Sequence, residues 1–298
     1  MVSTLKLNTF NCRGLGNVSK RRAIFKWLKQ NHRGIVLLQE THCSERNEKD
    51  WGKEWGGKIY FSHGNTGSRG VAILFPPTFE AEIHAIKKDL EGRILILNMT
   101  TEFGPIVIAN IYCPTKDYPD EQIRVLNNLN EMITEYQQNN VVIGGDFNIC
   151  QNPTMDKIGG NHNHSSKATL EIENIKSDMN IIDIWRTLHP DSTRCTRRQM
   201  SKSGLVQSRL DFWLISTFML YDVEKCDIYP GLKSDHSVVT LHFKSNETQP
   251  RGRGFFKFNT LLLKDRKYVE MIKQEIMEFT ESNKNLENKG LLWDCLKC

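Results

Sequence analysis

The most constraining feature of the sequence is an apolar run that ends in two glycines and then in polar residues. Residues 141–145 read Val-Val-Ile-Gly-Gly, and Asp146, Phe147 and Asn148 follow them. Such a run predicts a buried central strand, and the glycines let the backbone turn sharply or approach a ligand closely. Asp146 and Asn148 are two positions apart, so on an extended segment their side chains share one face. The segment predicts a proton acceptor beside an amide, although an ordinary turn has the same pattern.

The length and the composition exclude several classes of protein. A chain of 298 residues can bury one large core together with an appendage. No uncharged apolar stretch is long enough to span a bilayer, and residues 1–6 lack the apolar block of a signal peptide. We therefore expect an intracellular protein with no membrane partner. The eight cysteines are scattered singly, which favours reduced, buried thiols over a disulfide framework.

The basic residues are clustered more strongly than the net charge of +5 indicates. One cluster comprises Arg194, Arg197, Arg198, Lys202 and Arg209, and a second lies within residues 251–257. Clusters of this kind are typical of a surface that follows phosphate groups, and equally of a solvated loop.

Several predicted strands begin or end on polar side chains. Alternation over residues 6–11 and the apolar run 34–39 predict two such strands, and residues 106–112 predict another before a proline. The polar residues at the strand ends are Asn11, Glu40, Tyr112, Asp146, Asn148, Asp211, Asp235 and His236. If the strands form one packed pair of sheets, these ends converge on a single rim, where catalytic groups usually lie.

The rest of the chain gives a coarse architecture. Strands 71–75, 93–98 and 106–112 are separated by short turns, which favours an antiparallel meander. Residues 119–138 and 167–179 have the apolar spacing of helices, and residues 193–209 predict a protruding loop or hairpin.

The polar set is chemically coherent. One glutamate with an asparagine and an aspartate suits a hard, oxygen-seeking ion such as magnesium, which retains waters and uses few carboxylates. A histidine, an aspartate that orients it, a tyrosine hydroxyl and an asparagine amide can bind and stabilise a pentavalent phosphorus.

Three other patterns carry less weight. Gly14 and Gly16 precede a predicted helix without completing a phosphate-binding loop. His162 and His164 lack further ligands at metal-binding spacing, and Cys295 with Cys298 lacks a second cysteine pair.

Six segments of the chain resemble, in the same order, the exonuclease-endonuclease-phosphatase superfamily, and within it the apurinic-type endonucleases of LINE (non-LTR) retrotransposons. The segments are Asn-Cys-Arg-Gly-Leu at 11–15, Leu-Gln-Glu-Thr-His at 38–42, Asn-Ile-Tyr-Cys-Pro at 110–114, Gly-Gly-Asp-Phe-Asn at 144–148, Ser-Arg-Leu-Asp at 208–211 and Ser-Asp-His at 234–236. The resemblance covers residues 4–244, and residues 182–190 are similar to the retrotransposon branch in particular.

This resemblance implies a DNase I-like, four-layered α/β sandwich in which two packed, mixed and mainly antiparallel sheets are flanked by helices. It implies an enzyme that uses Mg²⁺ or Mn²⁺ to nick one strand of double-stranded target DNA. The 3′ hydroxyl that is left would prime reverse transcription of the element's RNA, with cleavage in the nucleus. The element RNA and a reverse transcriptase domain would be partners in the full-length polyprotein, and this fragment would be a monomer.

The resemblance also implies a domain organisation. Residues 1–245 would form the endonuclease domain. Residues 246–298 would be a basic linker and the helical start of a segment that leads to the reverse transcriptase, and the last helix lacks a stop signal. We therefore expect a truncated piece of a longer protein.

Roles carry over from the family position by position. Glu40 would be the principal metal ligand, positioned by Asn11, with Asp235 close to the ion. The residues expected to act on the phosphate are Tyr112, Asp146, Asn148, Asp211, Asp235 and His236. Asp146 would orient or deprotonate the attacking water, whereas His236, with its tautomer fixed by Asp211, would stabilise the phosphate or take the proton. Either residue could be the base.

The residues expected to contact nucleic acid are Arg13, Thr196, Arg197, Arg198, Ser208 and Arg209. Repair enzymes of the superfamily carry an acid where this chain has Arg13, so specific cleavage at abasic sites is not expected. Retrotransposon relatives often carry an aromatic residue after Thr196, where this chain has Arg197. Target preference would then depend on charge and groove shape more than on stacking.

Two alternatives remain open. The chain could be another phosphodiesterase of the same fold, such as a general DNase, a repair endonuclease or an enzyme acting on lipid headgroups. Secreted DNases usually carry a signal and paired cysteines, and lipid enzymes expose apolar loops, and the sequence has neither feature. It could instead be a catalytically dead nucleic-acid-binding module, but every expected polar position is filled.

Overall fold

Two six-stranded sheets form the centre of the protein in this computed structural model, which describes residues 4–64, 67–160, 167–201, 204–244 and 263–282. Sheet A has the strand order β14 (Val223–Tyr229), β15 (Val238–Lys244), β1 (Thr4–Asn11), β2 (Ile35–Gln39), β4 (Val71–Leu74), β3 (Ile59–Ser62). Sheet B has the order β10 (Ile181–Asp183), β13 (Asp211–Ser216), β8 (Val141–Asp146), β7 (Gly104–Tyr112), β6 (Ile94–Thr101), β5 (Ala81–Lys88). The β1–β2 and β7–β8 pairs are parallel and the other pairs are antiparallel.

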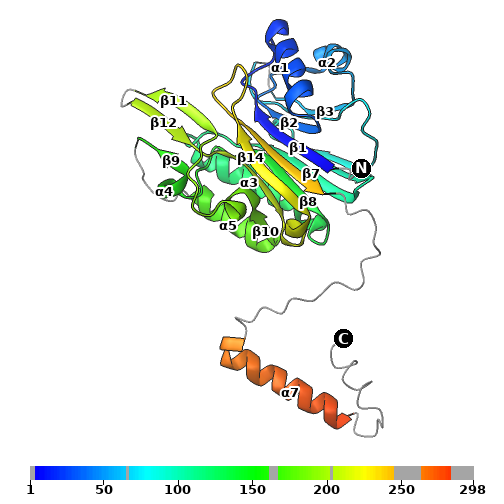
Figure 1. Ribbon diagram of the computed structural model, residues 1–298, viewed down its shortest axis with the longest axis vertical. Coiled ribbons are helices and arrows are strands. Elements are labelled where there is room, and N and C mark those ends of the chain that lie inside the picture. Colours follow the sequence, from blue (N-terminus) through cyan, green and yellow to red (C-terminus); the bar gives the residue numbers. More distant parts are fainter. Residues whose placement is uncertain (1–3, 65–66, 161–166, 202–203, 245–262, 283–298) are drawn as a thin grey trace. The chain divides into compact units, whose positions relative to one another are not determined.

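Helices cover the outer face of each sheet (Figure 1). On sheet A, α1 (Val18–Asn31) and α2 (Glu48–Trp55) bury Phe25, Trp51 and Trp55 against the strands. On sheet B, α3 (Pro119–Ile133) and α5 (Lys167–Asp178) bury an aliphatic cluster. A third cluster fills the space between the sheets. The predicted four-layered, DNase I-like sandwich is therefore confirmed.

A small third sheet lies beside this sandwich. It consists of β11 (Arg197–Ser201), β12 (Gly204–Ser208) and β9 (Lys157–Ile158), so the basic stretch is a hairpin. Short elements complete the unit: η1 (Glu45–Asn47), η2 (Thr134–Tyr136), α4 (Pro153–Asp156), α6 (Ile184–Leu188) and η3 (Thr217–Asp222).

The chain divides into two compact units, Met1–Glu247 and Thr248–Cys298. Within the second unit the described part is the helix α7 (Arg266–Ser282), preceded by residues 263–265. The expected boundary at residue 245 lies outside the described residues, as do His162, His164, Cys295 and Cys298. Among the helices described, none has the length and apolar character needed to cross a membrane.

The predicted meander is confirmed for strands 93–98 and 106–112, which form an antiparallel pair, but it is wrong for strand 71–75. β4 pairs with β2 and β3 in sheet A, whereas β6 and β7 pair with each other in sheet B. The strands β3 and β5 were not predicted. Short apolar strands specify burial but not which sheet they join, because that choice depends on partners distant in the sequence.

The two glycines of β8 are required by close packing. A Cβ on Gly144 would overlap the ring of Trp213 on β13, and a Cβ on Gly145 would overlap the Ile111 carbonyl on β7. Glycine therefore lets β8 lie tightly between its neighbours and delivers Asp146 to the end of sheet B.

Candidate active site

Asn11 links the ends of the two sheets. It is fully buried at the end of β1 in sheet A. Its Nδ2 donates one hydrogen bond to Oε1 of Glu40 at 2.8 Å and another to Oδ2 of Asp146, on sheet B, at 2.8 Å. The amide therefore fixes two carboxylates from different layers beside each other, as a single acidic edge of the rim.

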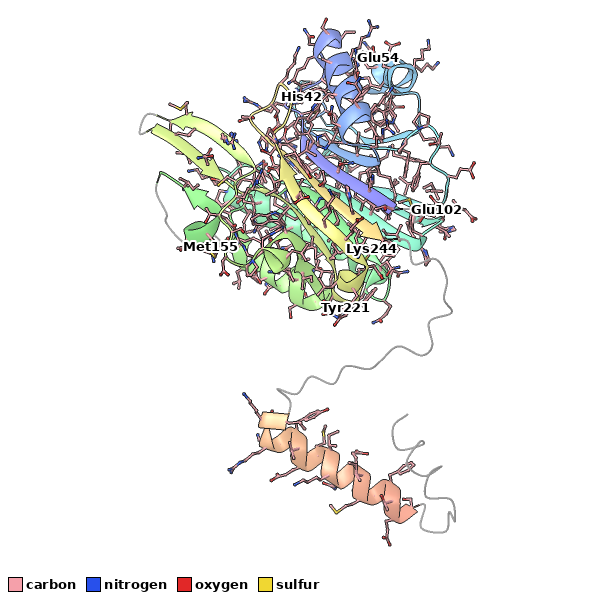
Figure 2. The ribbon with its side chains drawn as sticks, viewed as in Figure 1. His42, Glu54, Glu102, Met155, Tyr221 and Lys244 are labelled. Atoms are coloured by element: carbon pink, nitrogen blue, oxygen red, sulfur yellow. The ribbon has the colours of Figure 1, made fainter. Side chains whose placement is uncertain are left out.

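Glu40 has an unusual backbone conformation directly after β2. Its φ is 51°, and Arg13, His42 and Asn148 at the same rim also have positive φ. Non-glycine residues in this region are strained, and such strain is concentrated at functional sites. Nε2 of His42, labelled in Figure 2, lies 4.0 Å from Oε2 of Glu40. His42 belongs to the matched segment 38–42, but its place beside Glu40 was not predicted.

His236 lies between two aspartates from adjacent strands of sheet B. Its Nδ1 is 2.9 Å from Oδ2 of Asp211, and its Nε2 is 3.9 Å from Oδ2 of Asp146. Asp211 and Asp146 are paired across β13 and β8, and all three side chains are buried. The expected orienting contact between Asp211 and the imidazole is present in the geometry.

The two sides of this cluster differ in electrostatics. Burial and the nearby Asp211 carboxylate raise the pKa of Asp146 above its ordinary value. Burial opposes the charged form of His236, but the carboxylates of Asp211 and Asp146 outweigh it and raise the pKa of the imidazole. The site therefore favours a protonated His236 beside a carboxylate of unusually high basicity.

Tyr112 and Asn148 lie at the ends of β7 and β8. Burial, followed by the charges of Glu40 and Asp146, raises the pKa of the Tyr112 hydroxyl, so it remains a neutral donor. The backbone N–H of Asn148 donates to Oδ1 of Asp146 at 2.9 Å, and its side-chain Nδ2 donates to the Cys113 carbonyl at 2.8 Å. Asn148 thus helps to fix Asp146 as well as lying beside it.

Asp235 contacts two arginines. Its Oδ1 lies 3.2 Å from Nη1 of Arg13, and its Oδ2 lies 3.3 Å from Nε of Arg197. Burial opposes its ionisation, but His236 and the two guanidinium groups hold the pKa of Asp235 below its ordinary value. Among the described residues, the charged partners of Asp235 are therefore cations. Asp235 takes no part in the hydrogen bonds by which Asn11 joins Glu40 and Asp146.

The residues expected to contact nucleic acid fall into two groups. Arg13, whose side chain is 56% exposed, Arg197, Arg198 and Ser208 are accessible at the rim or on the β11–β12 hairpin. Thr196 is buried, and its hydroxyl donates to Oδ2 of Asp211 at 2.6 Å. We therefore correct its expected role, since a hydroxyl bonded inside the cluster positions Asp211 and does not present itself to DNA.

Arg209 requires the same correction. It is 1% exposed, and its Nε and Nη2 donate to the two oxygens of Asp156 at 2.8 and 2.9 Å. Its Nη2 is also 2.7 Å from Oδ2 of Asp183. Two buried carboxylates outweigh the desolvation of the guanidinium, so Arg209 is a structural residue that ties α4 and β10 to the base of the hairpin.

The rim offers oxygen ligands for a cation. Three groups that could ligate a metal, Asp146, Asp211 and His236, have donor atoms within 4.8 Å of one another. However, Asp211 already binds Thr196 and His236, which leaves the partly exposed Glu40 and the buried Asp146 as the carboxylates that could hold the ion. The nearby thiols of Cys12 and Cys113 have pKa values raised by burial, which disfavours thiolate ligation. This donor set fits a hard divalent cation.

Residues 9–236 match the profile of the Endonuclease/Exonuclease/phosphatase family. The chain belongs to this family. The match contains the whole rim, from Asn11 to His236, and the chain is accordingly an enzyme of the phosphoester-hydrolysing class.

Relatives of the chain include proteins of mobile elements and of DNA metabolism. It is 27% identical to the Transposon TX1 uncharacterized 149 kDa protein of Xenopus laevis over 270 residues, and this aligned region covers 90% of the chain. The chain spans only 20% of the length of that relative. It is also 23% identical to an exodeoxyribonuclease of Bacillus subtilis, over 80% of this chain and 98% of that protein.

Solved structures share the fold. An AP endonuclease from Archaeoglobus fulgidus superimposes with a TM-score of 0.65 and 22% identity, over 80% of this chain and 99% of that chain. The 3′ phosphatase NExo from Neisseria, bound to product DNA hairpin, gives a TM-score of 0.64 and 20% identity over the same shares of the two chains.

Proposed function

We propose that this chain is a magnesium-dependent endonuclease that nicks one strand of double-stranded DNA and leaves a 3′ hydroxyl for target-primed reverse transcription of a retrotransposon. The observation that carries the proposal is the Asn11 bridge between Glu40 and Asp146, beside the His236–Asp211 pair. The similarity to a transposon protein over 90% of the chain supports the retrotransposon context. A reverse transcriptase partner, element RNA and cleavage in the nucleus are parts of this proposal.

We propose that Asp146 is the general base, because burial and the Asp211 carboxylate raise its pKa and because two hydrogen bonds hold it in place. Its oxygens accept hydrogen bonds from Asn11 and from the Asn148 backbone, which fix the carboxylate where it can orient a water and take its proton. His236 would be protonated and would donate a hydrogen bond to a phosphate oxygen as negative charge develops there. A histidine that already carries the proton is a poor base, so in this proposal Asp146 is the base and His236 is the donor to the phosphate.

The other rim residues would bind the substrate. Magnesium held by Glu40, with Asp146 beside it, would supply charge that stabilises the phosphate and the leaving oxygen. The neutral Tyr112 hydroxyl would donate a hydrogen bond to the scissile phosphate. Arg13, Arg197, Arg198 and Ser208 would contact the flanking backbone, where phosphate contacts set the position of the duplex.

The test is cleavage of supercoiled plasmid with magnesium and with chelator, followed by mapping of the nick ends. We expect nicked circles whose 3′ ends a DNA polymerase extends without prior treatment. Asp146→Asn keeps the shape of the side chain and one of its two hydrogen-bond acceptors and removes the base, so it should lower the rate by roughly 1,000-fold or more. Normal nicking by folded Asp146→Asn protein would contradict the proposal.

A second candidate is an exonuclease or a 3′ phosphatase of the same family. It is favoured by the match to the exodeoxyribonuclease over 98% of that protein's length. Blunt and recessed duplexes with 3′-hydroxyl or 3′-phosphate ends distinguish the two. Digestion from ends with no nicking of closed circles would select the exonuclease, and inorganic phosphate released only from 3′-phosphate ends would select the phosphatase.

A further inference from the structure

The positive charge of the chain is concentrated at its start. Residues 1–39 contain eight lysines and arginines and no aspartate or glutamate, although the net charge of the whole chain is only +5. Arg13, Arg21 and Arg22 form ion pairs with Asp235 or Glu54. In the described part of the protein, Lys6, Lys29 and Arg33 form no ion pair with a carboxylate. Their charge is available to a partner.

Two cations, Lys6 and Lys225, flank a histidine on the outer face of sheet A. Lys6 on β1 is paired with His242 on β15, and His242 is paired in turn with Lys225 on β14. The alternate residues Leu5, Leu241 and others are buried between the sheets, so this row faces outward. Lys225 has one exposed contact with Asp227, at 3.7 Å. The row therefore presents two cations, one on either side of His242, that an anionic ligand could contact together.

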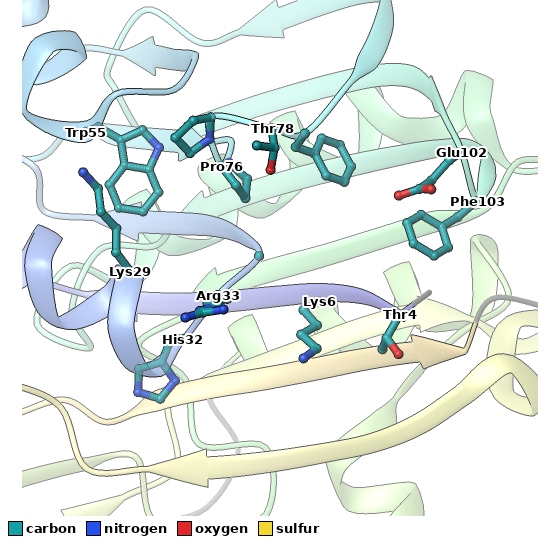
Figure 3. A pocket seen from close by; sticks show the side chains of 13 residues that line it. Thr4, Lys6, Lys29, His32, Arg33, Trp55, Pro76, Thr78, Glu102 and Phe103 are labelled. Atoms are coloured by element: carbon teal, nitrogen blue, oxygen red, sulfur yellow. The ribbon is translucent and has the colours of Figure 1, made fainter. Parts of the chain in front are cut away.

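The row forms the floor of a groove of about 500 Å³ whose lining includes Trp27, Arg33 and Tyr229. A second groove, of about 510 Å³, shares Lys6, His32 and Arg33 with the first. Figure 3 shows Lys6, His32 and Arg33 along one side of this second groove and Trp55, Pro76 and Phe103 along the other. The two grooves are therefore continuous around the turn between α1 and β2, and we call them together the basic groove.

Charge and aromatic side chains are interleaved in the basic groove. Its lining contains Lys6, Lys29, Arg33 and Lys225, and Glu102 is its one acid among the described residues. His32 makes an edge contact with Trp27 and a tilted contact with Tyr229, at centroid distances of 4.7 and 5.7 Å, and Tyr229 is 37% exposed. Cations that follow a phosphate backbone together with an open aromatic face are the features that bind single-stranded nucleic acid.

We propose that the basic groove is a second nucleic-acid site that binds single-stranded polynucleotide, with phosphates over Lys6, Arg33 and Lys225 and a base against Tyr229. This site goes beyond the proposed endonuclease function and does not rest on it. Lys6 is five residues from Asn11 along β1, a separation on the order of 16 Å. Figure 2 labels His42 at the catalytic rim and Lys244, which pairs with Thr4 at the opposite end of β1. A single strand can therefore occupy the groove while duplex DNA occupies the rim.

The first test measures binding of fluorescent 15-nucleotide oligo(U) and oligo(dT) in the presence of chelator. The double variant Lys6→Glu with Lys225→Glu should weaken binding by about tenfold or more, and it should reduce the salt dependence by about 1.4 in log–log slope, from two lost phosphate contacts. Equal losses with RNA and DNA support recognition of backbone and base faces, and a larger loss with RNA supports contacts to the 2′ hydroxyl.

The matched control carries the same change of charge elsewhere. Lys49→Glu with Lys88→Glu replaces two exposed lysines on α2 and β5 and should leave the affinity unchanged. If both double variants lose affinity equally, or if neither does, the basic groove is not the site. Because Lys6 and Lys225 are outside the catalytic rim, plasmid nicking by the first variant should equal that of the unmodified chain. The binding assay tests the basic groove whether or not the chain nicks plasmid.

Two further measurements separate a local site from a diffuse charge effect. Tyr229→Leu keeps the apolar contact with His32 and removes the stacking face, so affinity should fall about fivefold or more with no change in the salt slope. The groups that face His242 are Lys6, Lys225, Glu224 and Asp227. Phosphate bound over the row should raise the NMR-measured pKa of His242, and an unchanged titration on saturation with oligo(dT) would overturn the proposal.

Discussion

The hydroxyl of Thr196 donates a hydrogen bond of 2.6 Å to Oδ2 of Asp211, the same oxygen that lies 2.9 Å from Nδ1 of His236. Thr196 Oγ1 also accepts from the backbone N–H groups of Leu210 and Asp211. The three side chains thus form a buried line from the start of the hairpin to the imidazole of His236. A carboxylate held from both sides keeps one orientation, so we infer that Thr196 positions Asp211 and, through it, His236.

Thr196→Val should therefore reduce activity while leaving DNA affinity unchanged. The substitution keeps the shape and removes the donor, and loss of a hydrogen bond to a charged group should lower kcat by roughly 10- to 100-fold with little change in KM. Thr196→Ser keeps the hydroxyl and should retain most of the activity. Nicking kinetics and DNA binding in chelator check both effects. A rise in KM alone would return Thr196 to the role of a DNA contact.

Arg209→Met should destabilise the fold by about 3–5 kcal/mol, because it removes the cationic partner of the buried Asp183 and leaves the buried Asp156 with Arg186 alone. Urea unfolding measures the loss. Arg198→Met, on the exposed hairpin, is the control and should change stability by less than about 0.5 kcal/mol. In DNA binding we expect the reverse order of effects. Arg198→Met should weaken DNA binding and lower its salt dependence, whereas Arg209→Met should not. An unchanged urea midpoint for Arg209→Met would refute the structural role.

The rim residues and Arg209 show what the sequence alone could predict and what it could not. Apolar runs ending on Asn11, Glu40 and Asp146 predicted strands and a common rim, because strand period and burial are local properties. Arg209 stood in a basic cluster and was predicted to contact DNA. Its partner Asp156 is 53 positions away, and only the tertiary fold brings them together. The two neighbours of β4 were missed for the same reason.

Gly144→Ala should destabilise the protein through steric overlap in the centre of sheet B. The new Cβ would overlap the ring of Trp213, which is itself fully buried and cannot move away. Overpacking of this kind costs about 1–3 kcal/mol. Gly16→Ala is a suitable control, because its added Cβ meets no heavy atom within 4 Å. Comparable urea midpoints for the two variants would show that β8 can shift to make room.

His242 should make the protein sensitive to acid. Burial and the charges of Lys225 and Lys6 lower the pKa of His242 from 6.5 to about 4. The unfolded state therefore takes up a proton first, so the contribution of His242 to stability is present above pH 6.5 and is lost as the pH falls towards 4.

Replacement by a residue that cannot be protonated should remove this sensitivity. We expect His242→Gln to reduce the loss of stability between neutral and acid pH by on the order of 1 kcal/mol, because solvent screens the half-buried ring. Urea midpoints at both pH values test this, with His84→Gln on the exposed face of β5 as the control. Equal acid sensitivity in all three proteins would exclude His242 as the cause.

Glu40 and Asp235 should respond differently to magnesium. Glu40→Gln can still accept the hydrogen bond from Asn11 but loses the charge of the accessible carboxylate. The magnesium concentration for half-maximal nicking should rise by about tenfold or more, and calorimetric titration should show weaker magnesium binding with unchanged thermal unfolding. Asp235 is held by Arg13 and Arg197, so Asp235→Asn should change magnesium affinity by less than about threefold. Equal losses in both variants would place Asp235 in the metal site and would mean that its arginines move away when the ion binds.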